Sequence, residues 1–142
     1  MFVYVLIILT FLFTFSGLIG EIYRVHSIQA NVEYEIQRAV NVSVGEAMID
    51  SWRQDKTGRL DTAEASQCLM EYFEVYLRLT PAMEKYSDGA LIYYLSLDPV
   101  SVTEDPPRMR VSGKIFIPSA FPIFIENVEV PFSISSRNSR LD

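Results

Sequence analysis

Residues 1–20 read MFVYVLIILTFLFTFSGLIG, and none of these side chains is charged. Glu21 and Arg24 follow at once, and all the other charged side chains lie beyond them. Twenty helical residues at about 1.5 Å each span about 30 Å, which is the thickness of the hydrocarbon core of a bilayer. We therefore expect this segment to be a helix that holds one end of the chain in a membrane, with the rest of the chain outside the lipid.

A retained anchor fits this segment better than a cleaved secretory signal. Such signals have a basic first region, an apolar stretch of about 7 to 15 residues and a small-x-small cleavage site. Here no basic residue precedes the apolar run, the run is longer, and Gly20 has Leu18 two positions before it. A single-pass anchor is predicted. Its orientation stays open, because Arg24 and Arg38 favour a cytoplasmic domain by the positive-inside rule, whereas removal of a short basic leader would allow an extracytoplasmic one.

Helical periodicity continues beyond the uncharged segment, with apolar residues at steps of three and four. These residues are Ile22, Val25, Ile28, Val32, Ile36, Ala39, Val40, Val44 and Ala47. The polar residues of the opposite side are Arg24, Asn31, Glu35 and Arg38. No proline occurs before Gln54, so we expect one helix, or two nearly continuous ones, of about 50 residues. Gly45 is the favoured bend, since Gly weakens a helix by about 1 kcal/mol relative to Ala.

A second helix is predicted after a polar turn at residues 55–58. Asp61 and Glu64 have the spacing of a capping box, with Asp61 as N-cap and Glu64 at the third helical position. Pro81 lies just beyond the end of the pattern. One side of this helix carries Ala65, Cys68, Leu69, Tyr72, Phe73, Tyr76 and Leu79. We expect this side to pack against the later half of the first helix.

From residue 87 onward the period of the apolar residues changes from 3.6 to 2. Residues 87–89 (SDG) predict a turn, and residues 90–97 (ALIYYLSL) a central strand, because both of its faces are apolar. Residues 100–104 predict a short extension. Residues 109–117 and 128–134 alternate as half-buried antiparallel strands, the second an edge strand because Pro131 cannot donate to a ladder. The polar tail, residues 136–142, is expected to be frayed.

This order of elements predicts an α+β fold, with the helices and strands segregated along the chain. A three- or four-stranded antiparallel sheet should cover the apolar stripe of the long helix. The expected divisions are a transmembrane or filament-core helix at 1–20, an amphipathic continuation of that stem at 21–54, and a small α+β globular domain at 55–142.

Composition and motifs argue against several functions. The net charge of −6 and the scattered basic residues disfavour nucleic acid as a partner. Cys68 and His26 are the only cysteine and histidine, so we expect no disulfide and no metal site; Cys68 is interpreted as a buried residue and His26 as an interfacial one. The six glycines are dispersed, which excludes a phosphate-binding loop.

No catalytic residue, cofactor site or small-molecule substrate is indicated, and we predict that the chain is not an enzyme. Glu71 and Glu74 lie one helical turn apart, but such pairs usually belong to a solvated helix face. Asn41-Val42-Ser43 fits the glycosylation pattern, although it lies within a predicted helix.

In layout the chain resembles the type IV pilin-like proteins, and more closely the TadE-like pseudopilins of tight-adherence pilus systems. The likeness consists of the hydrophobic stem, the helix through residues 22–52, and the late strands 109–117 and 128–134. Val5 stands where the family has a glutamate five residues into its mature stem. The resemblance implies a structural subunit of a cell-surface filament or its secretion machinery, with an extracytoplasmic domain.

The partners implied are the lipid bilayer and copies of the chain itself or other pilin-like subunits. Ser16, Gly17 and Gly20 would allow stems to approach closely, and Phe11 and Phe13 would supply apolar area. The alternative is a single-pass anchored binding module that pairs a partner strand at the edge near Pro131. A membrane-tethered enzyme is a third class, for which no active site is found. The first two differ in one observable, since a filament subunit should form large homo-oligomers and a tethered module should stay monomeric in detergent.

Overall fold

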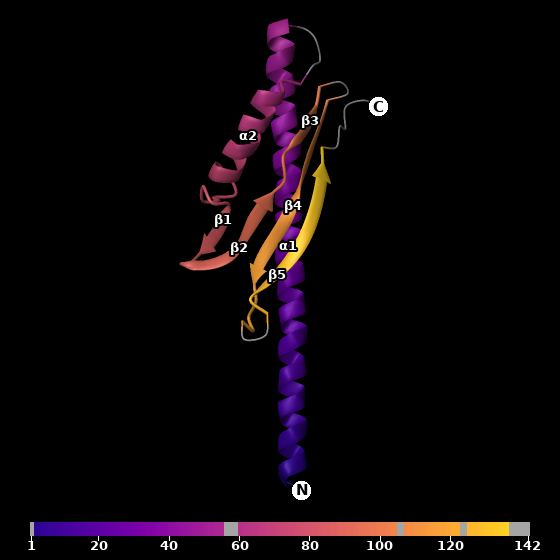
Figure 1. Ribbon diagram of the computed structural model, residues 1–142, viewed down its shortest axis with the longest axis vertical. Coiled ribbons are helices and arrows are strands. Elements are labelled where there is room, and N and C mark those ends of the chain that lie inside the picture. The colour runs from indigo at the N-terminus through magenta and orange to yellow at the C-terminus, as the bar shows by residue number, and fades with distance from the viewer. Residues whose placement is uncertain (1, 56–59, 105–106, 123–124, 137–142) are drawn as a thin grey trace.

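The computed structural model describes residues 2–55, 60–104, 107–122 and 125–136 of the chain. A single 54-residue helix, α1 (Phe2–Asp55), runs the length of the molecule (Figure 1). The chain therefore forms one long helix rather than two, and this helix continues through Gly45. The predicted turn after Asp55 and the tail after Ser136 lie outside the described residues.

The second helix, α2 (Thr62–Val75), begins at the predicted N-cap. The side-chain oxygen Oδ1 of Asp61 accepts hydrogen bonds from the backbone N–H groups of Ala63 (2.9 Å) and Glu64 (3.1 Å). These bonds satisfy donors that have no partner within the first helical turn. The predicted apolar side is buried at Ala65, Leu69, Tyr72 and Phe73. The prediction extended this apolar side too far when it included Tyr76, which is the C-cap residue and is 70% exposed.

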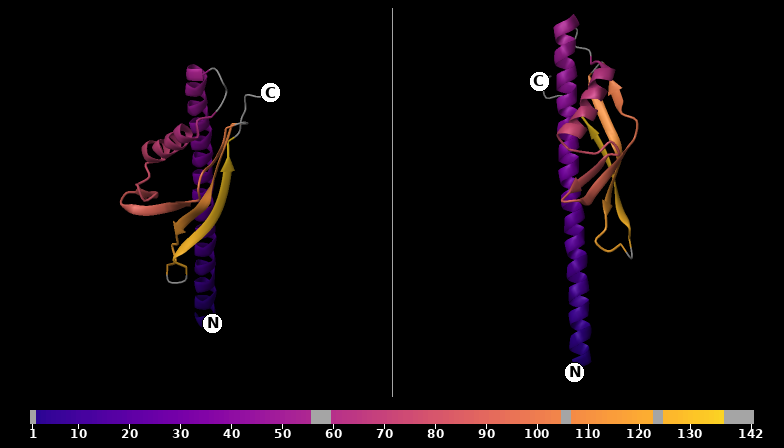
Figure 2. Two further views of the ribbon diagram at one scale, coloured as in Figure 1. Left: turned by 45° about the horizontal axis from the view of Figure 1, so that its top comes forward. Right: turned by 90° about the vertical axis from the view of Figure 1, so that its left-hand side faces the viewer.

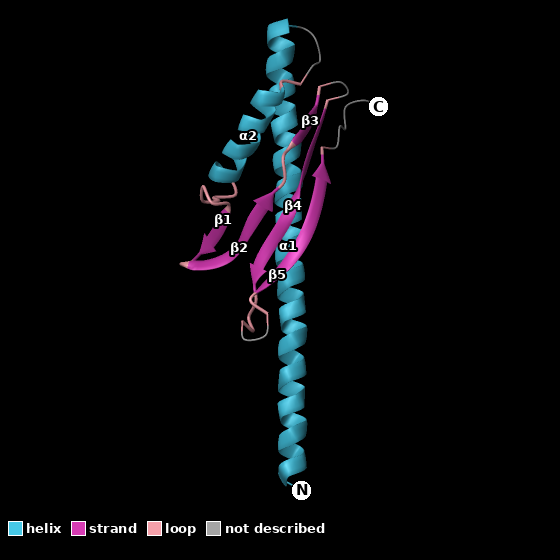
Figure 3. Cartoon of the chain, viewed as in Figure 1, coloured by secondary structure: helices cyan, strands magenta, loops and turns pink. Residues whose placement is uncertain are grey.

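Five strands form one antiparallel sheet, so the predicted number of strands was one or two too low (Figure 3). The strands are β1 (Glu84–Ser87), β2 (Ala90–Leu97), β3 (Ser101–Thr103), β4 (Arg108–Pro118) and β5 (Asn127–Ser135). β1 was missed because its sequence, EKYS, has no apolar alternation. The turn that joins it to β2 was predicted correctly: Asp88 and Gly89 have φ angles of 52° and 80°, the left-handed values that a tight hairpin requires.

β4 is the central strand of the sheet. It pairs with β5 along one edge and with β2 and β3, one after the other, along the other edge. Leu97 is paired with Gly113 and Ser101 with Arg110, so one extra residue lies between β2 and β3. Such an insertion is a bulge that bends the strand. β2 is an interior strand, as predicted, and among the described strands β5 pairs only with β4, which agrees with the edge position predicted from Pro131.

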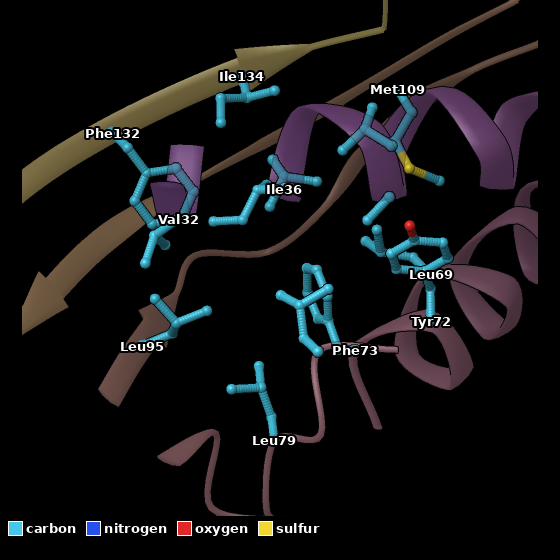
Figure 4. Close-up of a cluster of buried hydrophobic side chains, with 14 of the residues drawn as sticks. Val32, Ile36, Leu69, Tyr72, Phe73, Leu79, Leu95, Met109, Phe132 and Ile134 are labelled. Atoms are coloured by element: carbon cyan, nitrogen blue, oxygen red, sulfur yellow. The ribbon is translucent and has the colours of Figure 1, made fainter. Parts of the chain in front are cut away.

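The sheet and α2 lie on the same side of α1, and they leave most of residues 2–20 exposed (Figure 2). The core between them is centred on Ile36, which is fully buried among side chains from α2, β2, β4 and β5 (Figure 4). The later part of the predicted stripe is confirmed, since its members are at most 5% exposed: Val32, Ile36, Ala39, Val40, Val44 and Ala47.

The first part of that stripe is packed less well than predicted. Val25 and Ile28 are only partly buried against the core, and Ile22 is 60% exposed, so its assignment to the core was wrong. The reason is that the packed core begins beyond Ile22. Arg24 was expected on the outer side of the helix but is half-buried against the end of β4, where it donates to the carbonyl oxygen of Pro118.

Truncation of the helix stripe should destabilise the whole domain. Ile36→Ala should lower the free energy of unfolding by about 2–5 kcal/mol, because the side chain is fully enclosed and its removal leaves a cavity. Val32→Ala should act in the same direction by a smaller amount. Chemical denaturation of the full chain in detergent measures both. Tyr34→Ala, in which a 68% exposed side chain is truncated, is the control and should change stability by less than about 0.5 kcal/mol.

Gly113 is required where β4 pairs with the end of β2. A Cβ atom at this position would lie 2.2 Å from the backbone oxygen of Ser96, a contact that only a backbone shift can relieve. Gly113→Ala should therefore lower the free energy of unfolding by about 1–3 kcal/mol. Gly45→Ala is the matched control: no atom lies within 4 Å of the added Cβ, so this helical substitution should raise stability by up to about 1 kcal/mol. Equal effects of the two substitutions would contradict the close approach at Gly113.

Candidate functional site

Residues 2–20 of α1 form an apolar surface that the rest of the described chain leaves exposed, except in part at Gly17. Its most apolar 18-residue window has a mean hydropathy of 2.5, and none of that window is buried. Long apolar helices in the core of a soluble domain are buried by their neighbours, which is not the case here. The helix is long and apolar enough to cross a membrane. We call residues 2–20 the stem.

The stem is lined with large side chains and offers few polar groups. The hydroxyl groups of Thr10 and Thr14 donate to the carbonyl oxygens of Leu6 (2.9 Å) and Thr10 (2.8 Å), one turn earlier in the helix. Phe11 and Phe15 are stacked with their ring centroids 6.0 Å apart. A Cβ atom at Gly20 would meet nothing within 4 Å. The stem therefore has the composition of a lipid-facing or helix-facing surface, with an open site at Gly20 where another backbone could approach.

The stem ends at a polar contact with the sheet, which we call the boundary clasp: Glu21, Arg24, Pro118 and Ala120. Arg24 donates from Nε to Oε2 and from Nη2 to Oε1 of Glu21, both at 2.8 Å. Nη2 also donates to the carbonyl oxygen of Pro118. The Ala120 N–H donates to Oε1 of Glu21 at 2.9 Å. The clasp ties the loop after β4 to the helix at the first charged residues beyond the stem.

These hydrogen bonds shift the pKa values of both Glu21 and Arg24. The hydrogen bonds from Arg24 lower the pKa of Glu21 from 4.5 to about 2, against the opposing effect of burial and with help from the Ala120 N–H. The same hydrogen bonds raise the pKa of Arg24. The side chain of Glu21 is only 10% exposed, and a buried carboxylate is stable only with such partners. The pair thus stays ionised at neutral pH.

An acid and a base three residues apart on a helix were visible in the sequence, but their role was not inferred. The spacing allows the side chains to meet. Nothing in the sequence indicated that Pro118 and Ala120, almost a hundred residues later, would complete the contact. The same loop also limits the space at Gly17, because a Cβ atom at this position would lie 3.3 Å from Cζ of Phe121. The small residue makes room for a ring of its own chain.

The residues singled out for chemistry lie on two helices, His26 and Asn41 on α1 and Cys68, Glu71 and Glu74 on α2. His26 is exposed, Glu71 and Glu74 are exposed on α2, and Cys68 is half-buried rather than buried as expected. Ser43 is fully buried and donates to the carbonyl oxygen of Ala39 at 2.8 Å, so the tripeptide at Asn41 is held inside a helix and does not present its hydroxyl.

Two further features bear on ligands. Among the residues that the structure describes, no group of three or more His, Cys, Asp or Glu is placed to hold a metal ion. A hollow of about 440 Å³ at one end of the sheet is lined by Arg108, Arg110, Ser101, Thr103, Met109, Ser135 at the end of β5 and Ser136 after it. These described lining residues include no carboxylate or imidazole.

Comparison with known proteins returns no relative: no protein-family model, no curated protein and no solved structure matches the chain.

The boundary clasp should make the domain sensitive to acid. Because the pKa of Glu21 is lower in the folded chain than its ordinary 4.5, the clasp stabilises the fold above that pH, and its contribution is lost as pH falls from about 4.5 towards 2. Glu21→Gln should cost about 1.5 kcal/mol at pH 7, the lower end for a hydrogen bond to a charged group. Denaturation of the full chain in detergent at several pH values measures this.

The difference in stability between the wild type and Glu21→Gln isolates this carboxylate from the other acidic residues. It should shrink steadily below pH 4.5. Glu71→Gln, which alters an exposed carboxylate, is the control and should give no such pH-dependent difference. A difference for Glu21→Gln that stays constant down to pH 2.5 would contradict the lowered pKa.

Proposed function

We propose that the chain is a pilin-like structural subunit of a cell-surface filament, or of its assembly or secretion machinery, that assembles through the stem. The observation that carries the proposal is the unburied apolar stem, which leaves the domain as the direct continuation of a core helix. A flexible tether would be enough to anchor a module. An unbroken helix instead holds the domain at a set angle to the stem, as a regular array of subunits requires.

The layout of the domain is compatible with this role. A sheet of five antiparallel strands and a short helix cover the second half of the long helix, and only the β4–β5 end of the sheet reaches the first half, which leaves most of the stem available to lipid or to other stems (Figure 2). In a membrane, helices associate by close packing, and small residues at the contact favour it. Gly20 is such a residue and is open. We place the domain on the extracytoplasmic side, where a surface filament would be built.

A tethered binding module is the second candidate. It is favoured by β5, which pairs with β4 on one side only among the described strands and carries Pro131 in its exposed middle. A strand with an unpaired edge can receive a partner strand. The proline removes one donor from that edge and so limits the length of pairing.

Gly20→Leu tests the filament proposal in the full chain. The added side chain keeps the stem apolar, and its Cβ atom meets nothing within 4 Å in its own chain, but it blocks the close approach of another helix. We expect the wild type to form filaments or large oligomers in negative-stain images after detergent removal and in cross-linked membranes. The variant should form several-fold fewer while its thermal unfolding is unchanged.

Ile19→Leu is the matched control, because it exchanges one apolar side chain for another of equal size at the neighbouring position, and it should assemble as the wild type does. Discrete monomers of the wild type in both assays would overturn self-assembly and favour the tethered module. Assembly that is equally strong in the wild type and in Gly20→Leu would show that stems do not meet at Gly20.

A further inference from the structure

The loop between β4 and β5 exposes large apolar side chains next to the stem. Residues 119–126 read SAFPIFIE, of which 123 and 124 lie outside the described residues. Phe121 is 42% exposed and Ile125 is 56% exposed. The loop lies at the end of the sheet that is beside the first half of α1 (Figure 1). These side chains are therefore far from the core that the rest of the sheet covers.

The depth of this loop relative to the stem is fixed by the helix. The Phe121 ring lies against Gly17, and the boundary clasp holds Pro118 and Ala120 at the level of Glu21 and Arg24. The uncharged residues 2–20 span about 28 Å as a helix, slightly less than the hydrocarbon core of a bilayer. A stem that crosses the bilayer must use all of this length. Gly17, about 6 Å before Glu21 along the axis, then lies within the membrane, and so does the ring that touches it.

The described N–H groups at residues 119–121 and 125 are suited to a place with little water. The N–H groups of Ser119, Ala120 and Phe121 donate to the Glu126 carbonyl (3.1 Å), to Glu21 (2.9 Å) and to the Ser119 hydroxyl (3.0 Å). Pro122 has no N–H group, and the Ile125 N–H donates to the Phe121 carbonyl at 3.2 Å. Unsatisfied backbone groups are what makes irregular segments costly in lipid. The described donors of residues 119–122 and 125 already have partners or are absent.

We propose that this loop is a second membrane contact, in which Phe121 and Ile125 insert beside the stem into the interfacial region of one leaflet. The proposal rests on the stem crossing the bilayer but does not require a filament. Apolar side chains that insert about 5–10 Å at the boundary of headgroups and acyl chains are typical of interfacial anchors. The occupant is lipid rather than a second copy, because Phe121 is tied to the stem of its own chain and reaches the leaflet before any assembly occurs.

The loop thereby limits how the domain can turn about the membrane. A stem alone would fix only the distance of the domain from the bilayer and leave rotation about the helix axis free. A second contact on one side of the stem directs the β4–β5 end of the sheet to the lipid surface. The free edge of β5 then has a defined orientation relative to the membrane.

Tryptophan quenching by brominated lipids in vesicles of phosphatidylcholine tests the proposal with the full chain. Trp52, the only tryptophan, is first replaced by phenylalanine. In this background Phe121→Trp should lose about half or more of its emission with lipids brominated near the headgroup, and less with lipids brominated deep in the chain. Phe11→Trp in the stem should respond most to the deep bromines. Tyr86→Trp at the end of β1 is the water-exposed control and should not respond.

A second reporter, Ile125→Trp, covers the case in which Phe121→Trp disturbs the contact with Gly17, and it should respond as Phe121→Trp does. Quenching of Phe11→Trp without quenching at either loop position would overturn the loop contact while the membrane anchor stands. Loop tryptophans that are unquenched in dilute vesicles, and whose emission changes only as protein density rises, would show that a second copy covers the loop instead. No quenching at Phe11→Trp would overturn both the anchor and the loop contact.

Discussion

Because α1 is unbroken from Phe2 to Asp55, whatever fixes its second half also fixes the direction in which its first half leaves the domain. The second half is fixed by burial. Ile36, Ala39 and Val40 are fully enclosed by α2 and the inner face of the sheet. Loss of that packing would leave the stem attached to a loose chain, with no defined orientation relative to the rest of the domain. The packed second half of α1 and the exposed stem therefore belong to one continuous helix, and the orientation of one determines that of the other.

The change from the exposed apolar stem to the packed part of α1 takes place within one turn of the helix. Before Glu21 the side chains are uncharged and open, and after Arg24 the helix begins to pack against the sheet. The ion pair between these residues lies at this transition, where partial burial makes a charge-assisted hydrogen bond stronger than it would be in water. Its two additional partners are Pro118 at the end of β4 and Ala120 in the loop that follows, so the same contact closes the sheet onto the helix and sets the level of the loop along the stem.

The sheet reaches this geometry through an irregular edge. β4 is long enough to pair with two successive short strands, and the extra residue between β2 and β3 bends that edge around the helix. Just before the extra residue, the backbone oxygen of Ser96 lies 2.2 Å from where a side chain at Gly113 would begin. A glycine in the middle of a strand normally weakens it, and here it is the residue that permits the close approach.

The sequence by itself determined the long helix, the second helix from its Asp61 cap, and the strands β2, β4 and β5, because periodicity and caps are local properties of the chain. It also indicated the apolar stem, for the same reason. It did not reveal β1, whose short polar sequence becomes a strand only by pairing with β2, nor the exposure of Ile22, which depends on where the sheet ends. The boundary clasp and the position of Phe121 against Gly17 join residues about a hundred positions apart, and only the tertiary structure decided them, since no local pattern encodes which distant backbone groups will meet a side chain.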